Sequence, residues 1–176
     1  MKAFWIFSLM TILTSCSSTK VFMDYDKDAD ISKYQTYDYF LVENTGVNEL
    51  DEKRIIKALD SILNSKALEQ KKVIPDFNIN FYVETYTVNN QSNIGVGFGG
   101  GGRVGGGVSG GIPINTSKDM ISFTLEFFDA LTKELFWQAV VETRSKQNDT
   151  PTERRAFFYN IVQKALEKYP PTDIKK

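Results

Sequence analysis

The 176-residue sequence contains no histidine, and this absence limits the chemistry open to the chain. Serine and cysteine nucleophiles in hydrolases usually need an imidazole that accepts their proton near neutral pH. Zinc and similar metals also lose one of their commonest ligands. Carboxylate chemistry, a lysine or tyrosine base, or a function without catalysis remain, and we expect no cofactor and no metal.

Cysteine is nearly absent as well, because Cys16 is the only one and the chain cannot form an internal disulfide. Cys16 follows Leu13-Thr14-Ser15, behind Lys2 and an apolar stretch that is too short to span a bilayer. This arrangement is typical of a bacterial lipoprotein signal. We therefore expect residues 1–15 to be a signal peptide and Cys16 to carry the lipid, with acyl chains such as palmitate. The alternatives are an ordinary secretory signal with an unrelated cysteine, or a buried apolar strand.

Excess charge of either sign is also lacking. The chain has 21 Lys plus Arg against 22 Asp plus Glu, and the two signs are interspersed, which argues against a nucleic-acid partner. No second apolar stretch of about 20 residues follows the signal, so the lipid is the expected membrane attachment. Ser17 after the cysteine is neutral. We therefore expect a lipid anchor in the outer membrane of a Gram-negative envelope, with the domain on the periplasmic face.

Residue patterns predict an α+β fold with a two-layer arrangement. Apolar and polar residues alternate in four segments, 33–42, 76–85, 121–128 and 135–141, which predicts about four strands of an antiparallel sheet. Apolar residues at helical spacing follow two capping signals, which predicts two helices. The first signal is Asp51 as a capping residue, and the second is Thr150-Pro151-Thr152-Glu153, which has the residues of a capping box. The expected order is βαβββα, with both helices covering one face of the sheet.

The core positions follow from the same patterns. On the strands we expect Tyr37, Tyr39, Leu41, Phe77, Ile79, Phe81, Val83, Ile121, Phe123, Leu125, Phe127, Leu135, Trp137, Ala139 and Val141. On the helices we expect Ile55, Ala58, Leu59, Ile62, Leu63, Phe158, Ile161, Val162, Ala165 and Leu166.

Glycine is concentrated in one place, with 11 of the 12 glycines between Gly95 and Gly111. Such a run cannot bury enough apolar surface to offset the entropy of ordering it. We expect a glycine-rich mobile loop at 91–117, between the second and third strands. The other expected divisions are a lipidated N-terminus and tether at 16–30, a single domain at 31–171 and a tail at 172–176.

Two motifs within the glycine run match catalytic or binding patterns only in their letters. Gly95-Val-Gly-Phe-Gly-Gly100 fits the dinucleotide pattern, but that pattern needs a helix to begin inside it, and more glycine follows. Gly107-Val-Ser-Gly-Gly111 fits the hydrolase elbow, but Ser109 has no histidine to activate it. Both matches are expected from composition alone.

Acidic residues offer two further candidate sites. Asp24, Asp26, Asp28 and Asp30 resemble part of a calcium loop, although Ala29 and Gln35 replace its glycine and glutamate, so a solvated acidic edge is favoured over a looser calcium site. A second group is predicted to share the polar face of the sheet and could form a carboxylate pair or a ligand groove, although exposed acids are the ordinary case there. Its members are Glu84, Glu126, Glu142, Tyr82 and Phe128.

Four segments carry a resemblance to a known family: Val21–Tyr37, Pro75-Asp76-Phe77, Phe127–Trp137 and Tyr169-Pro170-Pro171. With these segments in this order, the chain resembles a family of small bacterial lipoproteins classed as a domain of unknown function (DUF4136). The resemblance implies an envelope lipoprotein with one α+β domain, and it supplies no catalytic residues. Tyr39 stands where the family pattern has a tryptophan.

Together these observations favour a non-enzymatic envelope lipoprotein that binds a partner protein or envelope component through its sheet or its glycine loop. One alternative is a histidine-free hydrolase or sugar-binding protein that works through Glu84, Glu126 or Glu142. Another is a subunit of a larger lipoprotein assembly in which Gly95–Gly111 becomes ordered on docking. The sequence does not fix an oligomeric state.

Overall fold

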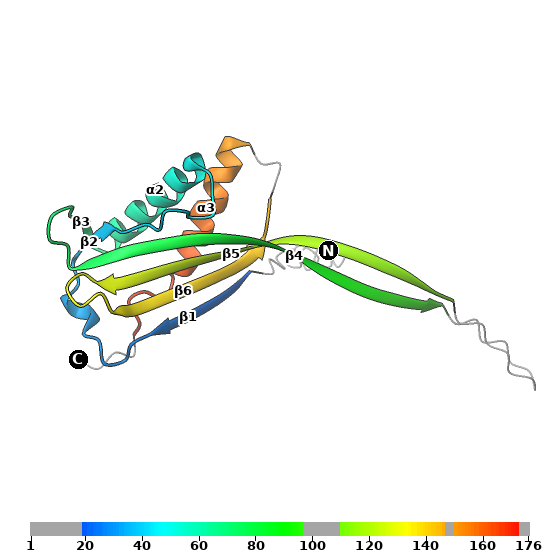
Figure 1. The fold of residues 1–176 in the computed structure, drawn as a ribbon, viewed down its shortest axis with the longest axis horizontal. Helices are drawn as coiled ribbons and strands as arrows, with labels where there is room; N and C mark the ends of the chain where they lie inside the picture. The colour runs from blue at the N-terminus through cyan, green and yellow to red at the C-terminus, as the bar shows by residue number, and fades with distance from the viewer. Residues whose placement is uncertain (1–18, 97–109, 147–149, 173–176) are drawn as a thin grey trace, which may run out of the picture.

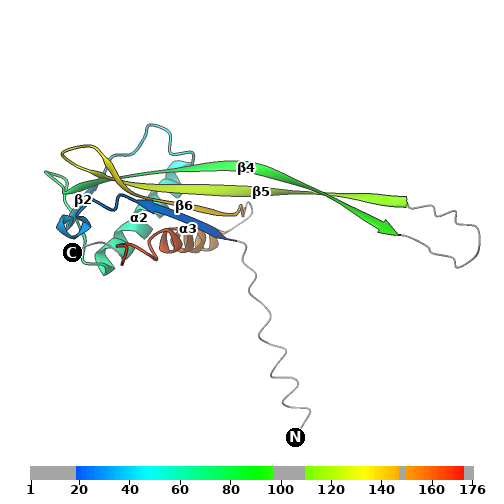
Figure 2. The ribbon, with the colours of Figure 1, turned by 90° about the horizontal axis from the view of Figure 1, so that it is seen from below.

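The computed structural model describes residues 19–96, 110–146 and 150–172, which form one sheet with two long helices on one of its faces (Figures 1 and 2). The strands are β1 (Lys20–Tyr25), β2 (Thr36–Tyr39), β3 (Glu69–Gln70), β4 (Phe77–Val96), β5 (Gly110–Asp129) and β6 (Leu135–Arg144). The helices are α2 (Glu49–Ser65) and α3 (Pro151–Ala165), and η2 (Ile31–Lys33) is a single 3₁₀ turn. The strand order across the sheet is β1-β6-β5-β4-β2-β3.

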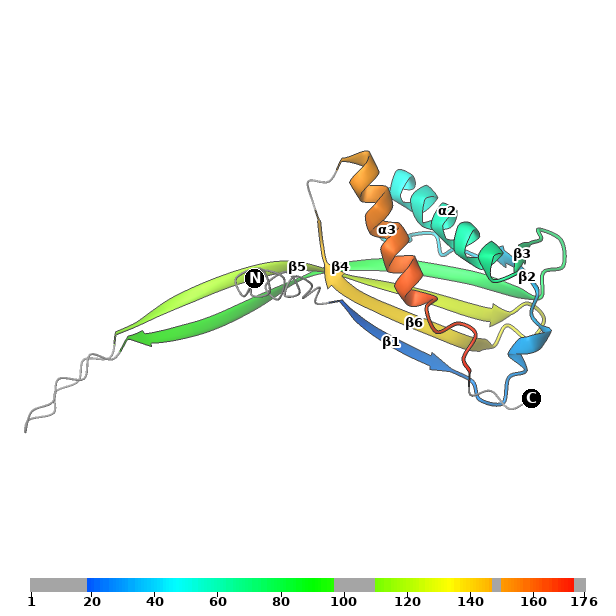
Figure 3. The same ribbon diagram turned by 180° about the vertical axis from the view of Figure 1, so that it is seen from behind.

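The α+β class and the two helices on one face are confirmed, whereas the sheet is larger than expected and mixed (Figure 3). It has six strands instead of about four. β2 runs parallel to both β3 and β4, and the other neighbours are antiparallel. β3 was missed because it is two exposed residues long and therefore carries no alternation to detect.

The tether expected at 16–30 is wrong for residues 20–25, which form β1. This strand pairs with β6 in a continuous antiparallel register from Lys20↔Glu142 to Tyr25↔Trp137. Four of its six residues are exposed, because it lies at the edge of the sheet. A strand with so little burial shows only a weak hydrophobic pattern, and its sequence therefore looked like a polar linker.

The core lies between the sheet and the helices and is rich in aromatic rings. Its largest fully buried side chains are Trp137, Tyr37, Phe77, Phe81, Phe123, Phe127, Phe158, Ile55, Leu59, Leu63, Ile79 and Leu125. The expected burial of Trp137 is thus confirmed, and its ring lies 4.6 Å from that of Phe127 and 5.1 Å from that of Tyr169. Burial of such side chains is the main stabilising contribution to a fold that has no internal disulfide.

β6 departs from the expected alternation at its first residues. Leu135 was expected in the core, but it is 42% exposed, whereas Phe136 is 3% exposed. The register shifts between Phe127 and Phe128, which face Trp137 and Leu135 respectively, so Phe136 is the extra residue of a β-bulge. Its ring stacks on that of Tyr34 at 4.2 Å. The bulge reverses which residues point inward, and strict alternation cannot predict it.

The two helix starts differ in how well they were predicted. α3 begins as expected, with Thr150 accepting from the N–H of Glu153 and the Glu153 carboxylate accepting from the N–H of Thr150. α2 begins earlier than expected, because Asn48 is its cap and accepts from the N–H of Asp51 at 3.0 Å. Asp51 is therefore inside the first turn, where its carboxylate is free to bind arginines.

β4 and β5 are each 20 residues long and pair along their whole length, from Phe77↔Asp129 to Val96↔Gly110. β6 pairs with β5 only from Met120 onward, so residues 87–96 and 110–119 form a two-stranded ribbon that projects beyond the sheet (Figure 1). The loop expected at 91–117 is accordingly wrong at both ends, where 91–96 and 110–117 are strand. Residues 97–109 lie outside the described part of the chain.

Candidate functional site

The face of the sheet turned away from the helices carries the predicted acidic group. Strand register places Lys20, Glu142, Ser122 and Glu84 side by side across β1, β6, β5 and β4. A parallel row, four residues further along β5, contains Asp24, Gln138, Glu126 and Asn80. All three candidate glutamates therefore share one face, as alternation predicted, but they occupy two different rows.

Glu126 is held by amides and not by another carboxylate. Asn80 Nδ2 donates to Glu126 Oε2 at 3.0 Å, and Gln138 Nε2 donates to Glu126 Oε1 at 3.0 Å. The Asn80 side chain is buried and also accepts from the backbone N–H of Val42 at 3.2 Å. Both carboxylate oxygens thus receive hydrogen bonds from neighbouring strands, which is an arrangement that holds strands together.

Glu84 and Glu142 lie on opposite sides of Ser122, two strand spacings or about 10 Å apart at the backbone. Glu126 lies four residues along β5 from Ser122, which is about 13 Å. Glu84 is exposed and Glu142 half-buried. Burial, followed by the charge of Glu142, raises the pKa of Tyr86 above its ordinary value. The three carboxylates therefore do not converge on one point.

An aromatic and apolar row lies between these two polar rows. It runs across the four strands through Phe22, Val140, Thr124 and Tyr82. Phe22 is 54% exposed, and Tyr82 and Val140 are half-buried. Phe128, also half-buried, lies on the same face. Phe22 was missed as a surface residue because β1 was taken for a tether, although its place opposite Val140 follows once β1 is known to pair.

The four N-terminal aspartates are spread over three local structures. Asp24 is in β1, Asp26 accepts from the N–H of Asp28 at 2.9 Å, and Asp30 caps η2 by accepting from Ser32. Within residues 19–96, 110–146 and 150–172, no three acidic side chains are grouped so that they could hold a metal ion. Of the four, Asp26 and Asp30 use their carboxylates to accept from backbone N–H groups two residues further on.

Three sequence candidates fall wholly or partly outside the described residues: Cys16, Ser109 and the second part of the glycine motif at 97–100. Gly95 and Val96, which open that motif, are the last two residues of β4 and continue its pairing with β5. No helix begins at these two residues, whereas a dinucleotide fingerprint needs one within its glycines.

The ribbon is a second candidate site, which the sequence indicated only as a loop. Tyr86, at the base of the ribbon, is 38% exposed, and Val88, within it, is 36% exposed. Thr87 Oγ1 lies 2.8 Å from Asp119 Oδ1 across the two strands. A two-stranded ribbon without a third strand or a covering helix is marginally stable in water. Its exposed apolar side chains and free edges are therefore suited to contact with another molecule.

A third feature is a groove of about 1010 Å³ bounded by α3, the C-terminal end of α2 and the end of β6. It includes none of Glu84, Glu126 and Glu142. We refer to it as the α3 groove. Neither helix of the described chain is both long and apolar enough to cross a bilayer.

Comparisons with known proteins agree with the fold. The family model described as "Domain of unknown function (DUF4136)" matches residues 21–171. No curated protein matches the chain. A PDZ domain protein from Parabacteroides distasonis is similar with a TM-score of 0.53 at 14% identity, and the match covers 97% of this chain and 40% of that one. That likeness shows a shared fold and nothing about ligand or activity.

Two structures of the PelC dodecamer from Paraburkholderia phytofirmans are more distant. Their identities are 8% and 10%, and their TM-scores are 0.46 and 0.49. The matches cover 84% of this chain, and 96% and 94% of the PelC chains. Likenesses of this size do not bear on the function of this chain.

Proposed function

The chain belongs to the family described as a domain of unknown function (DUF4136), and we propose that it is a non-enzymatic lipoprotein of the bacterial envelope that binds a partner protein. The lipid would be attached at Cys16, behind the apolar segment that resembles a lipoprotein signal. The neutral Ser17 favours the outer membrane, with the domain facing the periplasm.

The start of the fold is consistent with a short anchor. β1 begins at Lys20, so only residues 17–19 separate Cys16 from the sheet. Two or three acyl chains, each gaining about 0.8 kcal/mol per buried CH₂, anchor a protein far more firmly than one chain does. An anchor so close to β1 would hold the whole domain near the membrane surface.

The ribbon is the observation that best supports partner binding. It extends β4 and β5 by about 33 Å beyond the last residues supported by β6. Such a structure exposes backbone edges and the side chains of Tyr86 and Val88 without adding to the core. A partner that covers the ribbon would bury these groups and supply the support that the sheet does not give.

Site-specific photocrosslinking in cells tests this role. A photoreactive amino acid at Tyr86 should give a discrete higher-mass adduct, because that side chain lies at the base of the ribbon. The matched control is the same probe at Leu131, which is 87% exposed in the β5–β6 turn at the opposite end of the sheet. Absence of an adduct at Tyr86, or the same adducts from both positions, would count against the proposal.

A further inference from the structure

The α3 groove differs in charge from the chain as a whole. Four cationic side chains line it, Lys66, Arg144, Lys146 and Lys164, against the single carboxylate of Glu167. The complete sequence, by contrast, carries 21 basic and 22 acidic residues. The groove is therefore a local concentration of positive charge on a chain with no net positive charge.

Most of this charge is not neutralised from within the described chain. Arg144, Lys146 and Lys164 form no ion pair with any described residue, since the four ion pairs found there involve other cations. Lys66 Nζ donates to the backbone oxygen of Tyr169 at 2.7 Å, which leaves its charge uncompensated. Hydrogen bonds from Thr150 lower the pKa of the exposed Glu153 carboxylate, and the charge of Lys146 adds only a smaller effect in the same direction.

Hydrogen-bonding groups accompany the charges. Thr143, Asn160 and Gln163 also line the groove. Lysine and arginine together with hydroxyl and amide groups are the side chains that bind phosphate oxygens. The chemistry of the groove thus fits an anion that carries phosphate.

The position of the groove indicates where such an anion would come from. Thr19, the first described residue, lines the groove, and its hydroxyl lies 3.1 Å from that of Thr143. Cys16 is three residues earlier, and three residues of chain span at most about 11 Å. Lipid headgroups around an anchored Cys16 would then be within roughly one Debye length of the groove rim, which is about 8–10 Å at physiological salt.

We propose that the α3 groove binds the phosphate-bearing headgroups of an anionic membrane leaflet. Each basic residue near such a surface increases the affinity for it about fivefold. The groove would orient the domain on the leaflet, while the acyl chains hold it there. The proposed orientation rests on the anchor proposed above, but the headgroup binding itself does not.

Vesicle cosedimentation of a chain that begins at Ser17 separates the two proposals. This chain cannot be acylated at Cys16, yet it retains all described residues, including the core that lies within 31–169. It should bind vesicles that contain phosphatidylglycerol and not vesicles of phosphatidylcholine alone. The binding should weaken as salt rises from about 50 to about 300 mM, because the Debye length shortens over that range and surface charge is screened.

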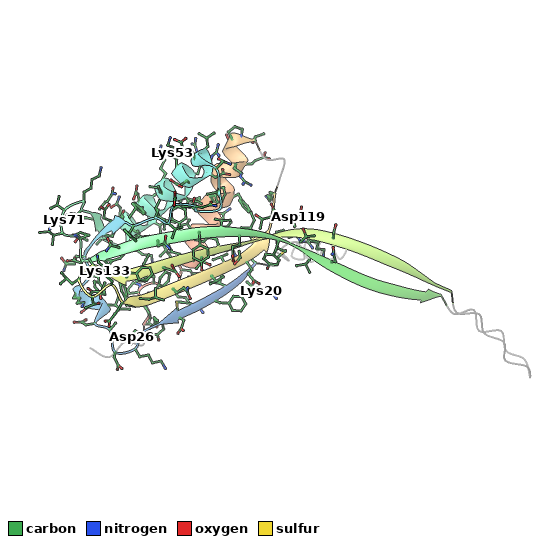
Figure 4. The ribbon with its side chains drawn as sticks, in the orientation of Figure 1. Lys20, Asp26, Lys53, Lys71, Asp119 and Lys133 are labelled. Carbon is green, nitrogen blue, oxygen red and sulfur yellow. The ribbon has the colours of Figure 1, made fainter. Side chains whose placement is uncertain are left out.

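Matched charge reversals test whether the groove is the site. Lys146→Glu with Lys164→Glu should reduce binding to the anionic vesicles by at least about 25-fold, which corresponds to two lost basic contacts. Lys71→Glu with Lys133→Glu makes the same change in net charge at exposed positions at the other end of the sheet, where Figure 4 labels both residues far from Lys20. This control should lose only a small part of the binding.

Three results would overturn the proposal: equal binding to both kinds of vesicle, equal losses in the two double variants, or binding to soluble dextran sulfate without binding to vesicles. Circular dichroism of both double variants shows whether each is folded. If Lys146→Glu with Lys164→Glu unfolds the chain, the neutral pair Lys146→Gln with Lys164→Gln replaces it, and an unchanged affinity there overturns the proposal equally. None of these results depends on acylation, so they leave the anchor to be tested separately.

Discussion

Asp51 connects the two helices at the scale of a single residue. Its side chain is 2% exposed and lies within 2.6 Å of Arg54 Nη1 and 2.9 Å of Arg154 Nη2. Burial alone would raise the pKa of Asp51, but hydrogen bonds from Arg154 and Arg54 outweigh it and hold that pKa below its ordinary value. The guanidinium of Arg154 also lies 4.8 Å from the ring of Phe158, so the network links α2 to the core side of α3.

Asp51→Asn should therefore destabilise the domain. It removes the charge that compensates Arg54 and Arg154, whose side chains are 21% and 24% exposed. Because water reaches both arginines, we expect the free energy of unfolding to fall by about 2–3 kcal/mol, which is less than for a fully buried pair. Urea unfolding monitored by tryptophan fluorescence measures this change. Lys53→Gln, which breaks the exposed pair with Glu49, is the control and should leave the midpoint unchanged. Equal midpoints for Asp51→Asn and wild type would show that the network adds nothing.

Gly46 permits a close approach between a loop and the sheet. Its φ is +75°, and a Cβ built there would lie 1.9 Å from the carbonyl oxygen of Val83. The neighbouring Thr45 carbonyl accepts from the N–H of Val83 at 2.8 Å, so the loop runs along β4 at this point. Backbone conformation and space both favour glycine here.

Gly46→Ala should consequently lower the free energy of unfolding by more than about 2 kcal/mol, since it introduces backbone strain and forces the loop away from β4. Thermal unfolding of the variant measures the loss. Glu43→Ala, at an exposed position of the same loop, is the control and should unfold at the wild-type temperature. If Gly46→Ala unfolds at that temperature too, then the contact between this loop and Val83 is not part of the stable fold.

The pKa of Tyr34 predicts how the stability of the fold changes at alkaline pH. Burial, aided by the hydrogen bond to Asp129, raises the pKa of Tyr34 to about 12 from the ordinary value of 10. The folded chain then keeps this proton after the unfolded chain has lost it, so stability should fall as pH rises from about 10 to about 12. Urea midpoints at a series of pH values measure the fall, and Tyr34→Phe should make it shallower. A flat profile across that range would contradict the burial and hydrogen bonding of Tyr34.

Among elements, those with strong repeating patterns were predictable and those at edges and irregularities were not. The capping box at Thr150 and the alternation in β4 predicted α3 and the central sheet, because local sequence determines both features. β1 was missed because an edge strand buries little, and the bulge at Phe136 was missed because it depends on pairing with β5.

The ribbon illustrates the same limit for a candidate site. Its glycine content predicted a loop, whereas the register shows that β4 and β5 continue pairing to Val96 and Gly110. Backbone hydrogen bonds between two strands do not require an apolar pattern, so a polar and glycine-rich segment can still form a ribbon. The acidic group was placed on the correct face by alternation, but its spread over two rows depends on strand register, which single-sequence patterns do not give.

Removing the ribbon should leave the domain folded. In a variant with residues 88–118 replaced by Asn-Gly, a two-residue turn closes the hairpin after the pair Thr87↔Asp119. The nearest buried residues are Val83 and Ile121, so the core is untouched and the urea midpoint should match that of the wild type. The same variant should lose the crosslinked adduct at Tyr86. A variant that aggregates or unfolds would show instead that the ribbon contributes to folding.

At the scale of the whole molecule, one end of the sheet brings together three features. β1 begins there at Lys20, the ribbon leaves the sheet at Met120, and the α3 groove opens beside Arg144. An anchor at Cys16 would place all three near the membrane surface. The basic groove would then face headgroups, and the ribbon would meet partners that lie close to the same leaflet.

Acylation of Cys16 is the claim on which this orientation depends, and metabolic labelling with a clickable fatty acid tests it most directly. The full-length wild type, expressed in a Gram-negative host, should carry the label and sediment with outer membranes, and Cys16→Ser should lose the label. Ser17→Ala is the matched control and should be labelled like the wild type. An unlabelled wild type, or a Cys16→Ser chain labelled to the same extent, would contradict the account.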